Sequence, residues 1–207
     1  MMRTSVDSQE PDRTLSQEGA QGPIRKPIAI TMGDPAGIGP EIILRALARA
    51  TETGLKGPFV VYGCPGWMKA VARRLGLNTG LLEVVPYAEV PEDLPVGHVS
   101  AAGGEAAFQA VYRAAQDAMA GKVRAVVTAP LSKAAMNLAG HVYPGHTEIL
   151  AEVGGNVPVR MMLANEELRT VLVSIHVPLR VAVSSLSTAG IVETIRLTDA
   201  FLRMTGI

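Results

Sequence analysis

Residues 27–50 read PIAITMGDPAGIGPEIILRALARA, and they carry the clearest pattern of strand, turn and helix in the chain. The apolar and β-branched run at 27–32 predicts a buried strand that ends at Gly33. Residues 40–50 place apolar side chains at helical spacing, and Pro40 and Glu41 both suit the first turn of a helix. The stretch therefore predicts a strand, a glycine-rich turn and a helix, the unit from which α/β proteins are built.

The same alternation continues to the end of the chain. Further strands are expected at 59–62, 83–86 (an edge strand, because of its proline), 125–129, 159–163 and 170–175. Further helices are expected at 67–77, 105–120, 132–138, 147–153 and 191–204. The pattern predicts an α/β fold, a mostly parallel sheet with flanking helices. We expect a disordered tail at 1–23, a first α/β subdomain at 24–125 and a second at 126–207.

Composition narrows the function classes. The 207 residues carry 19 Lys plus Arg and 19 Asp plus Glu, and only 4% are aromatic, so neither a basic nor an aromatic nucleic-acid surface is expected. Because Cys64 is the only cysteine, an internal disulfide is excluded, which fits the reducing cytoplasm. The sequence contains neither a secretory signal nor an apolar run of membrane-spanning length, so we expect a cytoplasmic protein without a membrane partner.

The glycine-rich turn is the first candidate binding element. Its residues, MGDPAGIGPE at 32–41, let backbone amides approach an anion at the start of a helix, although a tight structural turn would need the same residues. The glycine spacing matches neither a dinucleotide fingerprint nor a P-loop. Asp34 is expected at the carboxyl end of a strand, where ligands of α/β proteins usually bind.

The second candidate is TAPLSK at 128–133, again just after a strand. Lys133 is interpreted either as a ligand of a phosphate or carboxylate or as a solvated helix residue. Ser132 or Leu131 is expected near the helix cap. A nucleophilic pair of Ser132 and Lys133 is disfavoured because adjacent helical residues do not face each other.

Four histidines form the third candidate set. His146 and Thr147, at an expected helix start, offer side-chain and backbone donors to an anionic substrate. His176 follows an apolar strand, where a neutral imidazole would ligate a divalent metal; a hydrogen-bonded structural role is the alternative. His98 and His141 are interpreted as ordinary surface residues.

Four segments carry a family resemblance. They are ITMGDPAGIGPE (30–41), VTAPLSKAAMNLAG (127–140), YPGHTEILAE (143–152) and SIHVPLR (174–180). Together they resemble the 4-hydroxythreonine-4-phosphate dehydrogenase (PdxA) family, from about residue 26 to the end. The resemblance implies a fold like that of isocitrate and isopropylmalate dehydrogenases, in a homodimer. It also implies metal-dependent, NAD- or NADP-linked oxidation and decarboxylation of 4-phosphooxy-threonine to 3-amino-2-oxopropyl phosphate, in pyridoxal phosphate (vitamin B6) biosynthesis.

The resemblance also implies roles for individual residues. His146 and Thr147 would contact the small phosphorylated substrate. His176 would be one of three histidines on a divalent metal, zinc or else magnesium or cobalt. Asp34 and Lys133 would line the cleft, and no catalytic residue is assigned.

Alternatives to this activity stay open. Relatives of the family act on phosphorylated four-carbon sugar acids or on cis-dihydrodiols of aromatic acids, and a non-catalytic shortened homologue is a further reading. Members of the family are longer than this chain, and two of their metal histidines lie beyond residue 207. We therefore expect an N-terminal portion of about two thirds, without the C-terminal part of the fold and without measurable dehydrogenase activity on its own.

Overall fold

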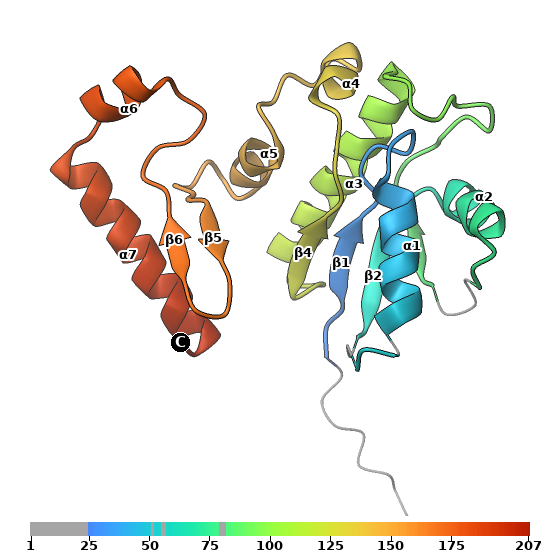
Figure 1. Ribbon diagram of the computed structural model, residues 1–207, viewed down its shortest axis with the longest axis horizontal. Coiled ribbons are helices and arrows are strands. Elements are labelled where there is room, and N and C mark those ends of the chain that lie inside the picture. The colour runs from blue at the N-terminus through green and yellow to red at the C-terminus, as the bar shows by residue number, and fades with distance from the viewer. Residues whose placement is uncertain (1–24, 51, 55–56, 79–81) are drawn as a thin grey trace, which may run out of the picture.

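The computed structural model describes residues 25–50, 52–54, 57–78 and 82–207 (Figure 1). The tail expected at 1–23 lies outside the described residues. Among the described helices, none combines the length and apolar character that crossing a membrane requires.

A four-stranded parallel sheet forms the N-terminal part of the molecule. Its strands are β1 (Ile28–Thr31), β2 (Phe59–Gly63), β3 (Val84–Pro86) and β4 (Ala125–Thr128), in the order β3-β2-β1-β4. All three pairings are parallel. The predicted parallel α/β architecture is confirmed, as is the edge position of β3. Because the strands are parallel, the loops that follow β1 and β4 meet at one edge of the sheet.

Helices cover both faces of this sheet (Figure 1). On one face, α1 (Gly39–Ala50) and α2 (Pro65–Leu75) pack apolar side chains against Met32 and Val61. On the other face, α3 (Ala101–Met119) packs its alanines against alternate residues of β1 and β2. The small side chains bring α3 close to the strands, and that closeness fixes the helix beside the loops at the sheet edge.

Helix α3 begins four residues earlier than the sequence predicts. The hydroxyl of Ser100 caps it, accepting the N–H of Gly103 at 3.1 Å. The alanines and glycines of the first turn carry too little apolar area to mark a helix in the sequence. The serine cap is the signal that locates the true start.

Two short helices follow β4 and lie against α3. They are α4 (Lys133–Leu138) and α5 (His146–Val153). A Cβ atom on Gly104 of α3 would lie 2.0 Å from the carbonyl oxygen of Ala135, so only glycine allows α3 and α4 to approach this closely. As predicted, Ser132 caps α4, with its hydroxyl accepting the N–H of Ala135 at 3.2 Å.

The C-terminal part forms a separate hairpin with two helices. Strands β5 (Met162–Ala164) and β6 (Arg169–Val171) pair antiparallel, followed by α6 (Leu179–Ser184) and α7 (Thr188–Thr205). Arg160 ties the hairpin to α7, because its Nε donates to the hydroxyl of Thr194 at 2.8 Å. The boundary predicted between residues 125 and 126 stays a prediction.

The structure of this C-terminal part differs from the sequence predictions in two ways. The strands are shorter than expected, since β6 pairs only with β5 and over three residues. The expected strand at 170–175 therefore stops at Val171, and helix α6 was not predicted at all. Within 160–207 only Thr194 is buried, so few tertiary contacts constrain the conformation of these residues.

Candidate functional site

The glycine-rich turn after β1 fits directly against the loop after β4. Gly33 has a φ of 70°, and a Cβ atom there would lie 2.3 Å from the carbonyl oxygen of Pro130. The N–H of Asp34 donates to the same carbonyl at 3.0 Å. The first two sequence motifs therefore meet, and glycine is required at position 33 for both its conformation and its close contact.

Asp34 lies at the carboxyl end of the sheet, where the sequence predicts it. It is only 8% exposed, and its Oδ1 accepts the N–H of Ala36 at 2.9 Å. A Cβ atom on Gly103, in the first turn of α3, would lie 2.8 Å from that oxygen. The carboxylate thus holds the turn closed beside the amino end of a helix, a favourable place for negative charge. Its role in lining a cleft stays a prediction.

His146 begins α5 and reaches back to the loop after β4. Its imidazole bonds to the backbone of Ala129, while its Nε2 is buried and has no hydrogen-bond partner among the described residues. Burial lowers the pKa of His146 below its usual 6.5, and the bond to Ala129 only partly opposes this. The ring is therefore neutral at pH 7, with a buried nitrogen left unpaired, which is costly without a ligand.

The unpaired nitrogen bears on the sequence prediction for His146. A neutral imidazole has one ring nitrogen that donates and one that accepts, so Nε2 can pair with an anionic oxygen or with a substrate hydroxyl, according to the tautomer. The contact of His146 with the substrate stays a prediction.

Lys133 and Thr147 lie around the same helix start. A Cβ atom on Gly145 would lie 3.9 Å from Cε of Lys133 and 3.7 Å from Oε2 of Glu148. The lysine stem therefore runs past the amino end of α5, where Thr147 lies half-buried in the first turn. A cation beside the start of a helix favours an anionic ligand. The Ser132 hydroxyl is engaged as a cap, in line with the disfavoured nucleophile pair.

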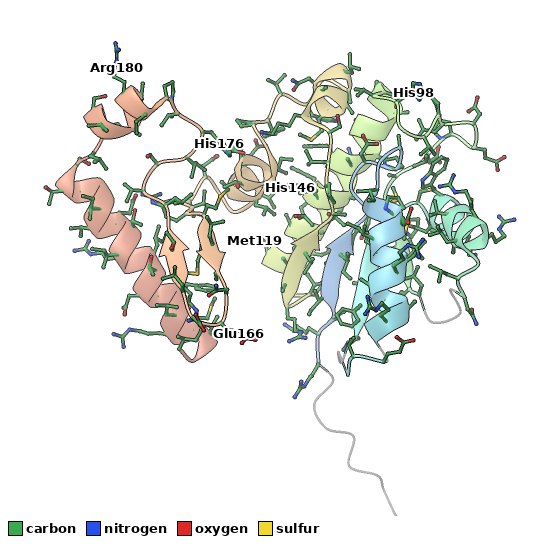
Figure 2. The ribbon with its side chains drawn as sticks, in the orientation of Figure 1. His98, Met119, His146, Glu166, His176 and Arg180 are labelled. Carbon is green, nitrogen blue, oxygen red and sulfur yellow. The ribbon has the colours of Figure 1, made fainter. Side chains whose placement is uncertain are left out.

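His176 lies apart from this group, in the loop between β6 and α6. It has a φ of 58°, a left-handed conformation that is uncommon for a residue with a side chain, and it is exposed. Figure 2 shows its loop on the side of the C-terminal part that faces α5, the helix headed by His146. Such backbone strain is often kept at functional positions.

The residues present do not complete a metal site. Catalytic zinc sites use about three protein ligands. Within the described ranges, no three His, Cys, Asp or Glu side chains lie close enough together to hold a metal ion. The role of His176 as a metal ligand stays a prediction.

The two remaining histidines differ from each other. His98 is exposed, and its Nδ1 lies 3.2 Å from the carbonyl oxygen of Val96. The prediction for His141 is wrong. Its ring stacks on Phe108 with centroids 3.6 Å apart, and its Nε2 lies 2.6 Å from Oε2 of Glu105. No local pattern reveals this role, because Glu105 is 36 positions away in the sequence.

Comparisons with known proteins agree with this architecture. Residues 60–207 match the family described as "Pyridoxal phosphate biosynthetic protein PdxA". The D-threonate 4-phosphate dehydrogenase of Salmonella typhimurium is 42% identical over 199 residues, which cover 87% of this chain and 60% of that protein. The 4-hydroxythreonine-4-phosphate dehydrogenase of Beijerinckia indica is 41% identical over 196 residues, covering 87% and 57%.

Solved structures give the same result. The crystal structure of a 4-hydroxythreonine-4-phosphate dehydrogenase from Burkholderia phymatum superposes with a TM-score of 0.79 at 34% identity, covering 87% of this chain and 59% of that one. The chain therefore spans about 60% of the length of its relatives. The match over residues 60–207, together with this shared fold, shows that the chain belongs to the PdxA family.

Proposed function

We propose that this chain supplies the substrate-binding part of an NAD- or NADP-linked dehydrogenase acting on a phosphorylated four-carbon hydroxy acid. The observation that carries the proposal is the buried, unpaired Nε2 of His146, beside the lysine and the helix start that favour an anion. Family membership supports the reaction class, since the relatives compared above are named as dehydrogenases of such compounds.

The site makes two kinds of contact with the substrate. Lys133, Thr147 and the amino end of α5 bind the phosphate, because they combine a cation, a hydroxyl and helix N–H groups. Nε2 of His146 makes a hydrogen bond with a substrate hydroxyl. Asp34 lines the cleft and holds the glycine-rich turn against the loop that carries Ala129.

His176 contributes one ligand to a divalent metal, zinc or else magnesium or cobalt. The other ligands come from outside the described residues, including a homodimer partner, since these residues do not complete a site. A divalent metal held there would lower the pKa of a substrate alcohol bound to it. NAD or NADP would serve as the hydride acceptor of the oxidation, which precedes decarboxylation in the proposed reaction.

Two substrates fit this chemistry. One is 4-phosphooxy-threonine, converted to 3-amino-2-oxopropyl phosphate in pyridoxal phosphate biosynthesis. The other is D-threonate 4-phosphate, favoured by the name of the 42% identical relative from Salmonella typhimurium. They differ at C2, where the first carries an amino group and the second a hydroxyl.

Binding measured by calorimetry tests the proposal. The purified chain is titrated with both phosphorylated acids and with unphosphorylated D-threonate. We expect His146→Ala to weaken binding of the preferred phosphorylated acid by about tenfold or more, the loss of roughly one good hydrogen bond. Lys133→Ala should weaken the binding of the phosphorylated acids but leave the affinity for D-threonate unchanged. His98→Ala, an exposed loop histidine, serves as the matched control.

The opposite results would overturn the proposal. They are equal affinity for phosphorylated and unphosphorylated acids, or unchanged affinity in His146→Ala. The ratio of affinities for the two phosphorylated acids selects between the two substrates.

A further inference from the structure

The loop that joins α4 to α5 is fastened to α3 just before it reaches His146. His141 lies in this loop, 23% exposed, with its ring stacked on Phe108 at an interplanar angle of 13°. Its Nε2 lies 2.6 Å from Oε2 of Glu105, and its backbone N–H donates to the carbonyl of Met136 at 2.9 Å. One face of α3 thus holds the His141 ring both by stacking and by a hydrogen bond.

Tyr143 also attaches this loop to α3, at a position closer to the site. Its ring also stacks on Phe108, with centroids 5.7 Å apart, and its hydroxyl donates to Oε2 of Glu152 in α5 at 2.7 Å. Phe108 is itself buried against Met136 and Ile149. The loop is therefore held on a rigid base up to three residues before His146.

Helix α3 is also the base of the other half of the site. Its first turn carries Gly103, which lies against the carboxylate of Asp34. Glu105 and Phe108 follow two and five positions later on the same helix. The distance between the glycine-rich turn and the His146 loop is consequently set by α3 and by what holds the loop to it.

We propose that His141 is a positioning residue, which through Glu105 and Phe108 fixes where the loop presents His146 and Thr147 to the substrate. Loss of the His141 ring frees the loop, and the His146 side chain then leaves its contact with Ala129. The effect on ligand binding rests on the proposed function, whereas the effect on the free protein does not.

The first test uses the free protein. The chain is prepared with ¹³C-labelled histidine, and the ring cross-peak of His146 is recorded together with amide hydrogen exchange. In His141→Ala we expect the His146 cross-peak to shift and the amides of residues 142–147 to exchange about tenfold faster or more. Amides of β1 and β4 should exchange as in the wild type, which separates loop positioning from general loss of stability.

Two conservative variants separate the stacking of His141 on Phe108 from its hydrogen bond with Glu105. His141→Phe keeps the stack on Phe108, and His141→Gln keeps a donor for Glu105. We expect each to restore part of the wild-type exchange, and the control His98→Ala to change nothing. Glu105→Ala combined with His141→Ala should be no worse than His141→Ala alone, because the two side chains act as one contact.

Three results would overturn the proposal. One is an unchanged His146 cross-peak and loop exchange in His141→Ala. Another is exchange that accelerates equally in the sheet and the loop, which would make His141 a general stabilising residue. The third is fully additive effects of the Glu105 and His141 substitutions.

The second test measures affinity for D-threonate 4-phosphate and 4-phosphooxy-threonine. We expect His141→Ala to weaken binding of the preferred acid by about tenfold, with partial rescue in His141→Phe. Unchanged affinity beside a displaced His146 would contradict the proposed effect on ligand binding. If the wild type binds neither acid, the proposed function fails, while the measurements on the free protein still decide the role of His141.

Discussion

Gly33 and Pro130 approach each other so closely that a Cβ atom on the glycine would lie 2.3 Å from the proline carbonyl oxygen. The two residues follow adjacent strands, β1 and β4, and the carbonyl also accepts the N–H of Asp34. Both loops of the candidate site are therefore locked together, and the position of Ala129, to which His146 bonds, depends on that contact.

Gly33→Ala should destabilise the protein more than Gly76→Ala. Both glycines have positive φ, 70° and 67°, which alone costs a residue with a side chain about 1–3 kcal/mol. Gly76 has open space around its Cβ direction, whereas Gly33 meets backbone. Urea unfolding of the two variants measures the difference. Equal losses would show that the contact with Pro130 is not tight.

His146 should titrate below pH 6.5 in the folded chain. Burial lowers its pKa, so the unfolded chain binds more protons than the folded one between the folded pKa and 6.5. Folding stability therefore falls as the pH drops through this window, and His146→Gln removes that part of the fall. Titration of the ring by NMR gives the pKa, and a value at or above 6.5 would contradict the burial of the imidazole.

Asp117→Asn should cost more stability than Lys122→Ala. The Asp117 carboxylate accepts hydrogen bonds from Lys122 and from the hydroxyls of Tyr62 and Tyr87, and the bond from Lys122 is the largest cause of its lowered pKa. Hydrogen bonds to a charged group contribute about 1.5–3 kcal/mol. Lys122 is an exposed partner, so its loss should cost much less stability than the loss of the Asp117 charge.

The pH dependence of this pair of variants gives an independent check. Because the pKa of Asp117 is lowered on folding, its contribution is present above its unfolded pKa near 4 and is lost as the pH falls through the lower, folded value. The stability gap between wild type and Asp117→Asn should therefore narrow in strong acid. A gap that stays constant with pH would show that the charge of Asp117 is not involved.

The sequence predicted those elements that are determined by a local pattern of residues. The strand, turn and helix at 27–50 were predictable because burial, glycine and proline positions all agree. The sequence placed both motifs just after strands, but their contact also requires β1 and β4 to be neighbours, and no local pattern predicts that strand order. The strand predicted at 170–175 is wrong beyond Val171. The run is apolar enough for a strand, but β5 offers partners for only the three residues of β6.

The role of His141 could not have been found in this way. Its partners, Glu105 and Phe108, lie on a helix more than thirty positions earlier in the sequence. Only tertiary packing brings them together. The burial of Nε2 of His146 without a partner likewise depends on tertiary packing, which no spacing reveals.

The central claim is that Nε2 of His146 meets the substrate. The most direct measurement follows the ring cross-peaks of all four histidines while D-threonate 4-phosphate and then 4-phosphooxy-threonine are added to the ¹³C-labelled chain. The account predicts that the His146 cross-peak moves saturably with at least one of these acids while the exposed His98 stays in place. A His146 cross-peak that keeps its free position at saturating concentrations of both acids would contradict it.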